Sequence, residues 1–219
     1  MCFSPEASFT TGALLAAAGV VSVKTTRKRA HLPFAIIPFI FSAQQFSEGV
    51  LWLGLLDPGK SELVMPFTYI FLFFAQVVWP FWVPFSMLLF EKKGTVRTIL
   101  GIFTGFGIMT SVYLAYSLIR YSNEASIRGH HIYYEQNYLD EVIWYIAGFY
   151  VIPILVSPFV SSFKRMNWLG VVMLFTFLAS LFFFRLWLVS VWCFFAAVIS
   201  VMVIWVLKGQ KKSVLSLLE

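Results

Sequence analysis

A short apolar segment, IFSAQQFSEGVLWLGL, carries polar side chains whose spacing indicates a buried site. Gln44, Glu48 and Trp52 follow one another every four residues, so on a helix they form one stripe, with Gln45 alongside. A carboxylate can bind a metal ion or act as a general base, and amides orient a ligand by hydrogen bonds. The alternative is that the glutamines join neighbouring helices.

The two cysteines extend this chemistry. Removal of Met1 is expected because Cys2 is small, and it would leave an α-amine beside a thiol. Such a pair can chelate zinc or copper, or act as a nucleophile with its own base. Glu48 is then a further ligand or a general base. Cys193 lies in SVWCFFAA, where it is a small apolar filler, a site residue, or a disulfide partner of Cys2.

The histidines add weaker candidates. His130 and His131 are adjacent, so they cannot share one face of a helix, and a solvated loop pair competes with a role as metal ligands. His31 lies beside a basic cluster and is expected at the interface between membrane and water. Two cysteines far apart make neither a disulfide framework nor a zinc-finger spacing.

The segment FAQVVWPFWVPF brings Gln76, Pro80 and Pro84 to positions four residues apart. Two prolines in one helix predict a kink and freed carbonyl oxygens, which either line a cavity or adapt the packing. Aromatic side chains would provide apolar walls for a ligand. The predicted ligand-binding residues are therefore Gln44, Gln45, Glu48, Trp52, Gln76, Trp79, Tyr145, Trp192 and Cys193.

The elements that position these residues are expected to cross a membrane. The 219 residues are 60% hydrophobic and only 12% charged, which is too little charge for a water-facing surface. A bilayer core needs about 20 apolar residues per helix. The sequence predicts an all-α bundle of seven transmembrane helices, a single domain over residues 1–219, with spans at Phe9–Val23, Leu32–Leu56, Met65–Phe90, Val96–Ile119, Glu141–Phe163, Trp168–Phe184 and Leu186–Leu207.

Details within these spans follow from composition. The first span is rich in Gly, Ala and Thr, which favours close packing against neighbours, and Ser4 and Pro5 are expected to cap and begin it. Gly49 should let another helix approach. Gly101 and Gly105 form a GxxxG pattern that favours close packing or dimerisation. A tight turn is expected at Arg185, although one long bent helix is the rival interpretation.

Charge predicts the orientation. Twelve of the 16 Lys and Arg residues fall in the connections after spans one, three and five and in the C-terminal tail. This side should be cytoplasmic, which places the N-terminus outside and the C-terminus inside. The long polar connection of residues 120–140 then lies outside. Glu48 and Cys193 would lie at a similar depth, about 10–12 Å below the outer ends of their helices. The basic residues mark topology, and no nucleic-acid partner is expected.

Two motifs carry a resemblance to a known family. The opening MCFSPEASF resembles that of uncharacterised bacterial membrane proteins that begin MCFSAxASF, and QQFSEGVLW resembles their HQxxEGxxW segment. The resemblance implies a multi-pass protein of the bacterial inner membrane. Gln44 stands where the family often has histidine, which weakens any model in which this position binds a metal.

Two functions compete. The first is the binding of a small apolar ligand, a lipid or a membrane protein partner at a polar Cys/Glu/Gln site near the outer leaflet. The second is a membrane-embedded enzyme or metal site that uses Cys2 and Glu48, with zinc or copper as the candidate metals and His130 and His131 as weaker ligands. A transporter ranks lowest because no inverted repeat is evident.

Overall fold

The computed structural model describes residues 4–92, 94–136, 140–183, 187, 191–192 and 195–215. Most of this part of the chain is helical. The helices are α1 (Pro5–Thr25), α2 (Leu32–Ala35), α3 (Ile37–Leu56), α4 (Val64–Leu72), α5 (Trp79–Leu88), α6 (Thr95–Arg120), α7 (Asp140–Val160), α8 (Lys164–Phe183) and α10 (Ala196–Leu215). Three short turns of other helix types are η1 (Arg29–His31), η2 (Pro58–Leu63) and η3 (Phe73–Val78), and two strands are β1 (Asn123–Arg128) and β2 (His131–Gln136).

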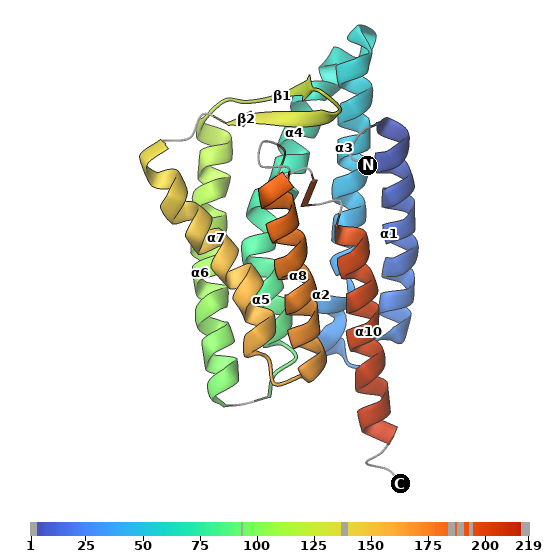
Figure 1. Cartoon of the computed structure of the whole chain (residues 1–219), viewed down its shortest axis with the longest axis vertical. Helices are drawn as coiled ribbons and strands as arrows, with labels where there is room; N and C mark the ends of the chain where they lie inside the picture. The colour runs from blue at the N-terminus through green and yellow to red at the C-terminus, as the bar shows by residue number, and fades with distance from the viewer. Residues whose placement is uncertain are drawn as a thin grey trace.

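The long helices lie side by side and run alternately up and down (Figure 1). The strands cover one end of the bundle, which we call the hairpin end. The opposite end, where α1, α5 and α7 finish, is called the basic end below. Because α1 begins at the hairpin end and α10 runs toward the basic end, the start of α1 and the end of α10 lie on opposite sides of the molecule (Figure 1).

Each of the seven predicted spans contains a helix. Five are long and apolar enough to cross a membrane: Pro5–Thr25, Arg29–Leu56, Pro58–Leu88, Thr95–Arg120 and Lys164–Phe183. Two shorter apolar helical stretches, Ala147–Val160 and Ala196–Gly209, lie in the remaining predicted spans. These findings are consistent with a membrane protein. The turn predicted at Arg185 lies outside the described residues.

The start of α1 confirms the predicted cap. The Ser4 side chain accepts a hydrogen bond of 3.3 Å from the backbone N–H of Ala7, and Pro5 occupies the first helical position. Serine satisfies one of the N–H groups that a helix start leaves unpaired, while proline has no N–H to leave unpaired there. This local chemistry explains why the helix begins at this point.

Close packing of α1 against α3 is also confirmed. A Cβ atom placed on Gly49 would lie 2.9 Å from the Phe9 ring, so any larger residue at this crossing would require that ring to move. Ser42 Oγ donates a hydrogen bond of 2.8 Å to the carbonyl oxygen of Gly12, which links the same two helices. The buried stripe of α1 therefore consists mainly of small residues, and its members are Pro5, Ser8, Thr11, Gly12, Leu15, Gly19 and Ser22.

The GxxxG pattern of α6 behaves differently. Among the residues that the structure describes, no heavy atom lies within 4 Å of a Cβ placed on Gly101 or Gly105, so close packing at these two glycines is not found there. Gly107 makes the tight contact instead, because a Cβ there would overlap the carbonyl oxygen of Pro80 on α5. The dimer that the pattern also suggested stays a prediction.

Residues 120–140 were predicted to form a polar connection in an all-α protein, and this expectation needs correction. β1 and β2 form an antiparallel hairpin, with Arg128 paired to His131 beside the turn at Gly129. Gly129 has a φ of 65°, a left-handed conformation that favours glycine. Ile132 is fully buried against Leu51 and Trp52 of α3. Apolar side chains on one face thus attach the hairpin to the helices.

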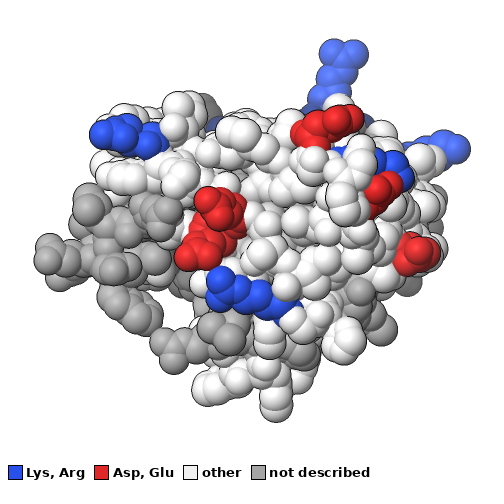
Figure 2. Space-filling model, turned by 90° about the horizontal axis from the view of Figure 1, so that it is seen from above, with Lys and Arg blue, Asp and Glu red and all other residues white. Residues whose placement is uncertain are grey.

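Charges differ between the two ends. Figure 2 views the hairpin end, where acidic and basic side chains both appear on a largely uncharged surface. Two exposed ion pairs lie there: Asp57 with Lys60 at 2.9 Å, and Glu135 with Arg128 at 3.2 Å. The basic end carries, among the described residues, Lys24, Arg27, Lys28, Arg29, Lys92, Arg97, Lys164, Arg165 and Lys208.

The acidic residue described at the basic end is buried. Glu91 Oε1 accepts hydrogen bonds from Ser161 Oγ at 2.7 Å and from the backbone N–H of Ser162 at 2.9 Å, which joins the ends of α5 and α7. His31 was expected at an interface, but it is buried as well, stacked on Phe90 with ring centroids 3.9 Å apart. The exposed charge of this end is therefore positive over the residues that the structure describes.

Candidate functional site

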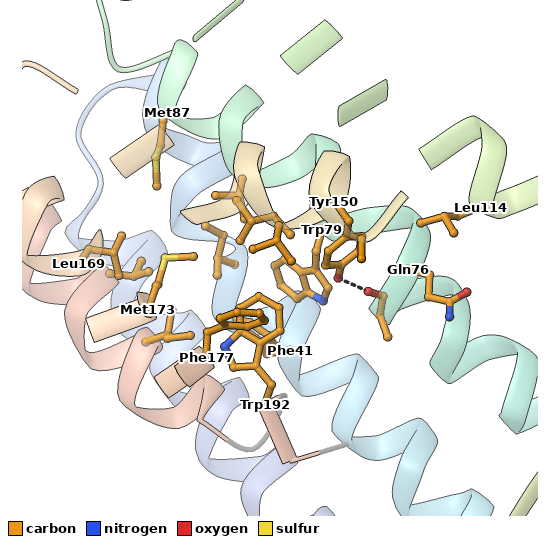
Figure 3. Close-up of a pocket in the computed structure, with 18 of the residues that line it drawn as sticks. Phe41, Gln76, Trp79, Met87, Leu114, Tyr150, Leu169, Met173, Phe177 and Trp192 are labelled. Carbon is orange, nitrogen blue, oxygen red and sulfur yellow. Dashed lines mark hydrogen bonds between the residues drawn. The ribbon is translucent and has the colours of Figure 1, made fainter. Parts of the chain in front are cut away.

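A cavity of about 320 Å³ lies among the helices. Its walls come from α3, η3 and α5 through α8, together with Trp192 and two residues of α10, and Gln136 of β2 contributes at one place. Figure 3 shows Gln76 and Leu114 toward one end and Leu169 and Met87 toward the other. The walls are mainly aliphatic and aromatic, and a small number of polar groups interrupt them. This combination is typical of a site for an apolar ligand.

The cavity adjoins an irregular stretch of helix. η3, a π-helical segment, runs directly into Trp79 and Pro80. Pro80 has no N–H, so carbonyl oxygens one turn earlier lose their usual donor. Ala75 and Gln76, in that turn, both line the cavity. A π-helical segment and a freed carbonyl oxygen are thus found beside a cavity, while the predicted kink itself stays a prediction.

Tyr150 of α7 compensates for the missing donor. Its hydroxyl donates a hydrogen bond to the carbonyl oxygen of Ala75, drawn as a dashed line in Figure 3. The second proline acts on packing: Pro84 frees the carbonyl oxygen of Pro80, which meets Gly107 on α6. The two alternatives for the prolines therefore both apply. The Ala75 carbonyl oxygen lies beside the cavity, and the Pro80 carbonyl oxygen packs against another helix.

Trp79 separates the cavity from a second group of polar residues. One face of its indole lines the cavity beside Phe41, with ring centroids 4.0 Å apart. Its Nε1 donates a hydrogen bond of 2.9 Å to Oε1 of Gln44, which is fully buried. The indole is thus held by two residues of α3, through a ring contact with Phe41 and a hydrogen bond to Gln44.

Beyond Trp79 lies a buried polar layer, formed by Gln44, Gln45, Glu48 and Trp52 of α3. All four side chains are at most 3% exposed, which confirms that the predicted stripe faces the interior. Gln45 Nε2 donates a hydrogen bond of 3.3 Å to Glu48 Oε2. Trp52 Nε1 and Gln45 Oε1 are buried with no hydrogen-bond partner among the described residues.

The sequence placed all its candidates in one site, and the structure divides them. Gln76, Trp79 and Trp192 line the cavity, whereas the buried polar layer does not. The division arises because the Gln44 side chain accepts a hydrogen bond from Trp79. Trp79 therefore lies between the cavity and the buried polar layer. Glu48 lies one further turn toward the hairpin end, since α3 runs in that direction.

Several cavity residues carried no sequence signal. Phe41, Tyr150, Met173 and Phe177 line it from three different helices. Each lies in an apolar run in which many residues are equally hydrophobic, so composition does not distinguish them. Gln136 was also missed, because its segment was expected to be a surface loop. Its position at the end of β2 brings it to the cavity.

Three predicted site residues are not available for description. Cys2 and Cys193 lie outside the described residues, so their proposed roles and the possible disulfide stay predictions. Tyr145 lies in α7, but the described side chains of that helix begin at Ala147. The catalytic alternative for Cys2 and Glu48 therefore also stays a prediction.

The histidine pair is only partly a solvated loop pair. His130 is exposed at the hairpin turn, but His131 begins β2 and is 6% exposed, stacked against Trp187 with ring centroids 4.8 Å apart. Burial lowers the pKa of the His131 imidazole, and the neighbouring His130 acts in the same direction. Within the described part of the chain, no three His, Cys, Asp or Glu side chains are close enough to share a metal ion.

Comparison with known proteins supplies a family and no function. No curated protein and no solved structure matches the chain. One family model matches over residues 1–216, and its description is a family of unknown function. The resemblance inferred from the two motifs is consistent with such a family. The chain therefore belongs to the family of unknown function DUF6629.

Proposed function

We propose that the chain crosses the bacterial inner membrane seven times, with the hairpin end outside and the basic end in the cytoplasm. The positive charge of the basic end supports this orientation through the positive-inside rule. Large exposed apolar side chains along the helices support contact with lipid; examples are Ile119, Phe175 and Met109, which are 85%, 73% and 69% exposed.

We further propose that the protein binds a small apolar ligand, or the apolar part of a lipid, in the cavity. The cavity itself is the observation that carries this proposal. Its volume of about 320 Å³ is at the lower end of ordinary ligand pockets, about 300–1,000 Å³. An apolar molecule there would contact aromatic and aliphatic walls on several sides at once.

The ligand would enter from the bilayer between α6 and α7. Tyr113 of α6 and Ala147 of α7 both line the cavity, and both are exposed on the outer surface of the helices, Tyr113 by 37%. In the proposed orientation this surface faces lipid. An apolar ligand would therefore reach the site without passing through water, which would oppose its transfer.

The polar layer has a supporting role in this proposal. Gln44 holds the Trp79 indole by its Nε1 and so maintains one wall of the cavity. A bundle with a space at its centre needs such positioning, because side chains around a void otherwise relax into it. Glu48 and Gln45 belong to the same layer and connect it toward the hairpin end.

The test fills the cavity. Val151 of α7 lines it, whereas Ile152, the next residue, is 52% exposed and does not. Val151→Trp should occupy the space, and Ile152→Trp is the matched control on the outer surface. Each protein is purified in detergent and loaded with methyl oleate, and native mass spectrometry counts the molecules retained. We expect Val151→Trp to reduce retention by about tenfold or more, and Ile152→Trp to leave it unchanged.

Thermal unfolding of the three proteins shows whether the variants remain folded. Equal retention by wild type, Val151→Trp and Ile152→Trp would contradict the proposal, because the bound molecules would then lie elsewhere on the apolar surface. Absence of any retained molecule in wild type, at saturating methyl oleate, would contradict it as well.

A further inference from the structure

The cavity wall indicates the charge of its ligand. None of the cavity-lining side chains that the structure describes belongs to Lys, Arg, His, Asp or Glu. A charged group entering the cavity would give up its water and find no opposite charge. The wall chemistry therefore favours a neutral molecule over a fatty-acid anion or an amine.

Trp192 supplies a polar group whose hydrogen-bond donor is unsatisfied. Its indole packs edge to face on Phe177, with ring centroids 5.1 Å apart and planes at 67°, and both rings line the cavity. Its Nε1 is buried and has no acceptor among the described residues. An indole N–H donates and never accepts, so the missing partner is an acceptor. Leaving such a donor unpaired costs stability, which a bound acceptor would restore.

Gln136 adds a second donor from another element. Its Nε2 is also buried without an acceptor in the described part of the chain, and the residue lines the cavity from β2. By contrast, other polar groups of the wall are already engaged: Tyr150 with Ala75, and Trp79 with Gln44. The unsatisfied polar atoms of Trp192 and Gln136 are thus both N–H donors.

We infer that the cavity selects neutral apolar molecules that carry a carbonyl oxygen, and that Trp192 Nε1 donates a hydrogen bond to this oxygen. The inference rests on the proposed function, since it specifies the ligand of the same cavity. A carbonyl oxygen on an apolar body occurs in fatty-acyl esters and in the rings of alkylated quinones. Both offer an acceptor and no charge.

The experiment compares three probes of different chemistry. Methyl oleate carries an ester carbonyl, decylubiquinone carries ring carbonyls, and octadecene is a hydrocarbon with no acceptor. Native mass spectrometry titrations in detergent give an apparent affinity of the purified full-length protein for each. The variants are Trp192→Phe, which keeps a ring and removes the N–H, and Gln136→Met, which keeps the length of the side chain. Trp168→Phe is the control, because Trp168 is 61% exposed on α8.

We expect at least one carbonyl probe to bind wild type more tightly than octadecene. Trp192→Phe should weaken that probe by about fivefold to tenfold, the value of one hydrogen bond, and should change octadecene by less than about twofold. Gln136→Met should act in the same direction, and Trp168→Phe should act on neither probe. The carbonyl probe that loses affinity identifies the source, ester or quinone.

The two proposals fail in different ways. If all three probes bind wild type equally and neither Trp192→Phe nor Gln136→Met distinguishes them, the carbonyl inference is wrong while the cavity still binds apolar molecules. If no probe binds wild type, the proposed function is wrong and the inference falls with it. Gln136→Met keeps the inference testable should Trp192→Phe fail to fold.

Discussion

Two regions of this protein are built from apolar helices and differ in the space that they leave. Between α1 and α3, glycine and serine allow the helices to touch, so that a Cβ on Gly49 would lie 2.9 Å from the Phe9 ring. Around α5, α7 and α8, large aromatic and branched side chains meet beside a π-helical segment and leave about 320 Å³ open. Hydropathy is high in both regions, so hydropathy does not predict which one holds a cavity.

Small residues allow close contact at one interface, whereas a π-helical segment that precedes a proline lies beside the cavity at the other. A straight helix over 64–88 would keep one regular set of ridges for its neighbours. The π-helical turn displaces that register, and Tyr150 satisfies the carbonyl oxygen of Ala75. The buried polar side chains lie in the region that has no cavity. Gln44, Gln45 and Glu48 belong to α3 in the closely packed region.

The largest expected effect comes from adding volume to the closed region. Gly49→Leu should destabilise the protein by about 3 kcal/mol or more, because the new side chain collides with Phe9 and forces α1 away from α3. Gly101→Leu is the matched control, since no heavy atom of the described residues lies within 4 Å of a Cβ there. Thermal unfolding in detergent measures both. The contrast between a closely packed region and a region with a cavity is wrong if Gly49→Leu lowers stability no more than the cavity-filling Val151→Trp does.

An effect of intermediate size is expected in the buried polar layer. Glu48→Leu removes the acceptor of Gln45 Nε2 and leaves a buried amide unsatisfied, at a cost of about 1–3 kcal/mol. Glu62→Leu, at an exposed position of η2, should change stability little. Adding Gln45→Leu to Glu48→Leu should recover part of the loss, because both partners of the hydrogen bond are then apolar. A double variant less stable than Glu48→Leu alone would mean that Gln45 has a separate stabilising role.

The smallest effect is expected at the π-helical segment. Tyr150→Phe removes the donor to the carbonyl oxygen of Ala75 and should cost about 1 kcal/mol, with reduced retention of methyl oleate because the cavity wall is less fixed. Tyr116→Phe, at a residue 60% exposed on α6, is the control for loss of a hydroxyl. The role assigned to Tyr150 in holding the π-helical segment is wrong if the two variants have the same stability and the same retention.

Local patterns were reliable where a short sequence decides the outcome by itself. Ser4 and Pro5 start α1 as predicted, because a cap depends on residues within one turn. The stripe of Gln44, Glu48 and Trp52 is buried along one face, since helical period places those residues together in any fold. The long apolar stretches likewise correspond to helices.

Patterns that depend on a neighbour were less reliable. Gly101 and Gly105 match a packing motif, yet Gly107 is the residue that contacts another helix, and the motif itself says nothing of where α5 crosses. His131 seemed to belong to a solvated pair, but the hairpin turns it inward against Trp187. The hairpin was not anticipated because its polar residues resemble those of a loop, and its attachment depends on Ile132 reaching α3.

The sequence by itself predicted a mostly helical chain, the approximate helical segments, the contrast in charge between the two ends and the buried stripe of α3. These properties follow from composition and period, which act within one segment. Tertiary structure decided that Trp79 separates the polar layer from the cavity, and that Tyr150, Trp192 and Gln136 reach the same space. Such a space depends on how helices distant in the chain pack together, and packing geometry is set by all of them at once.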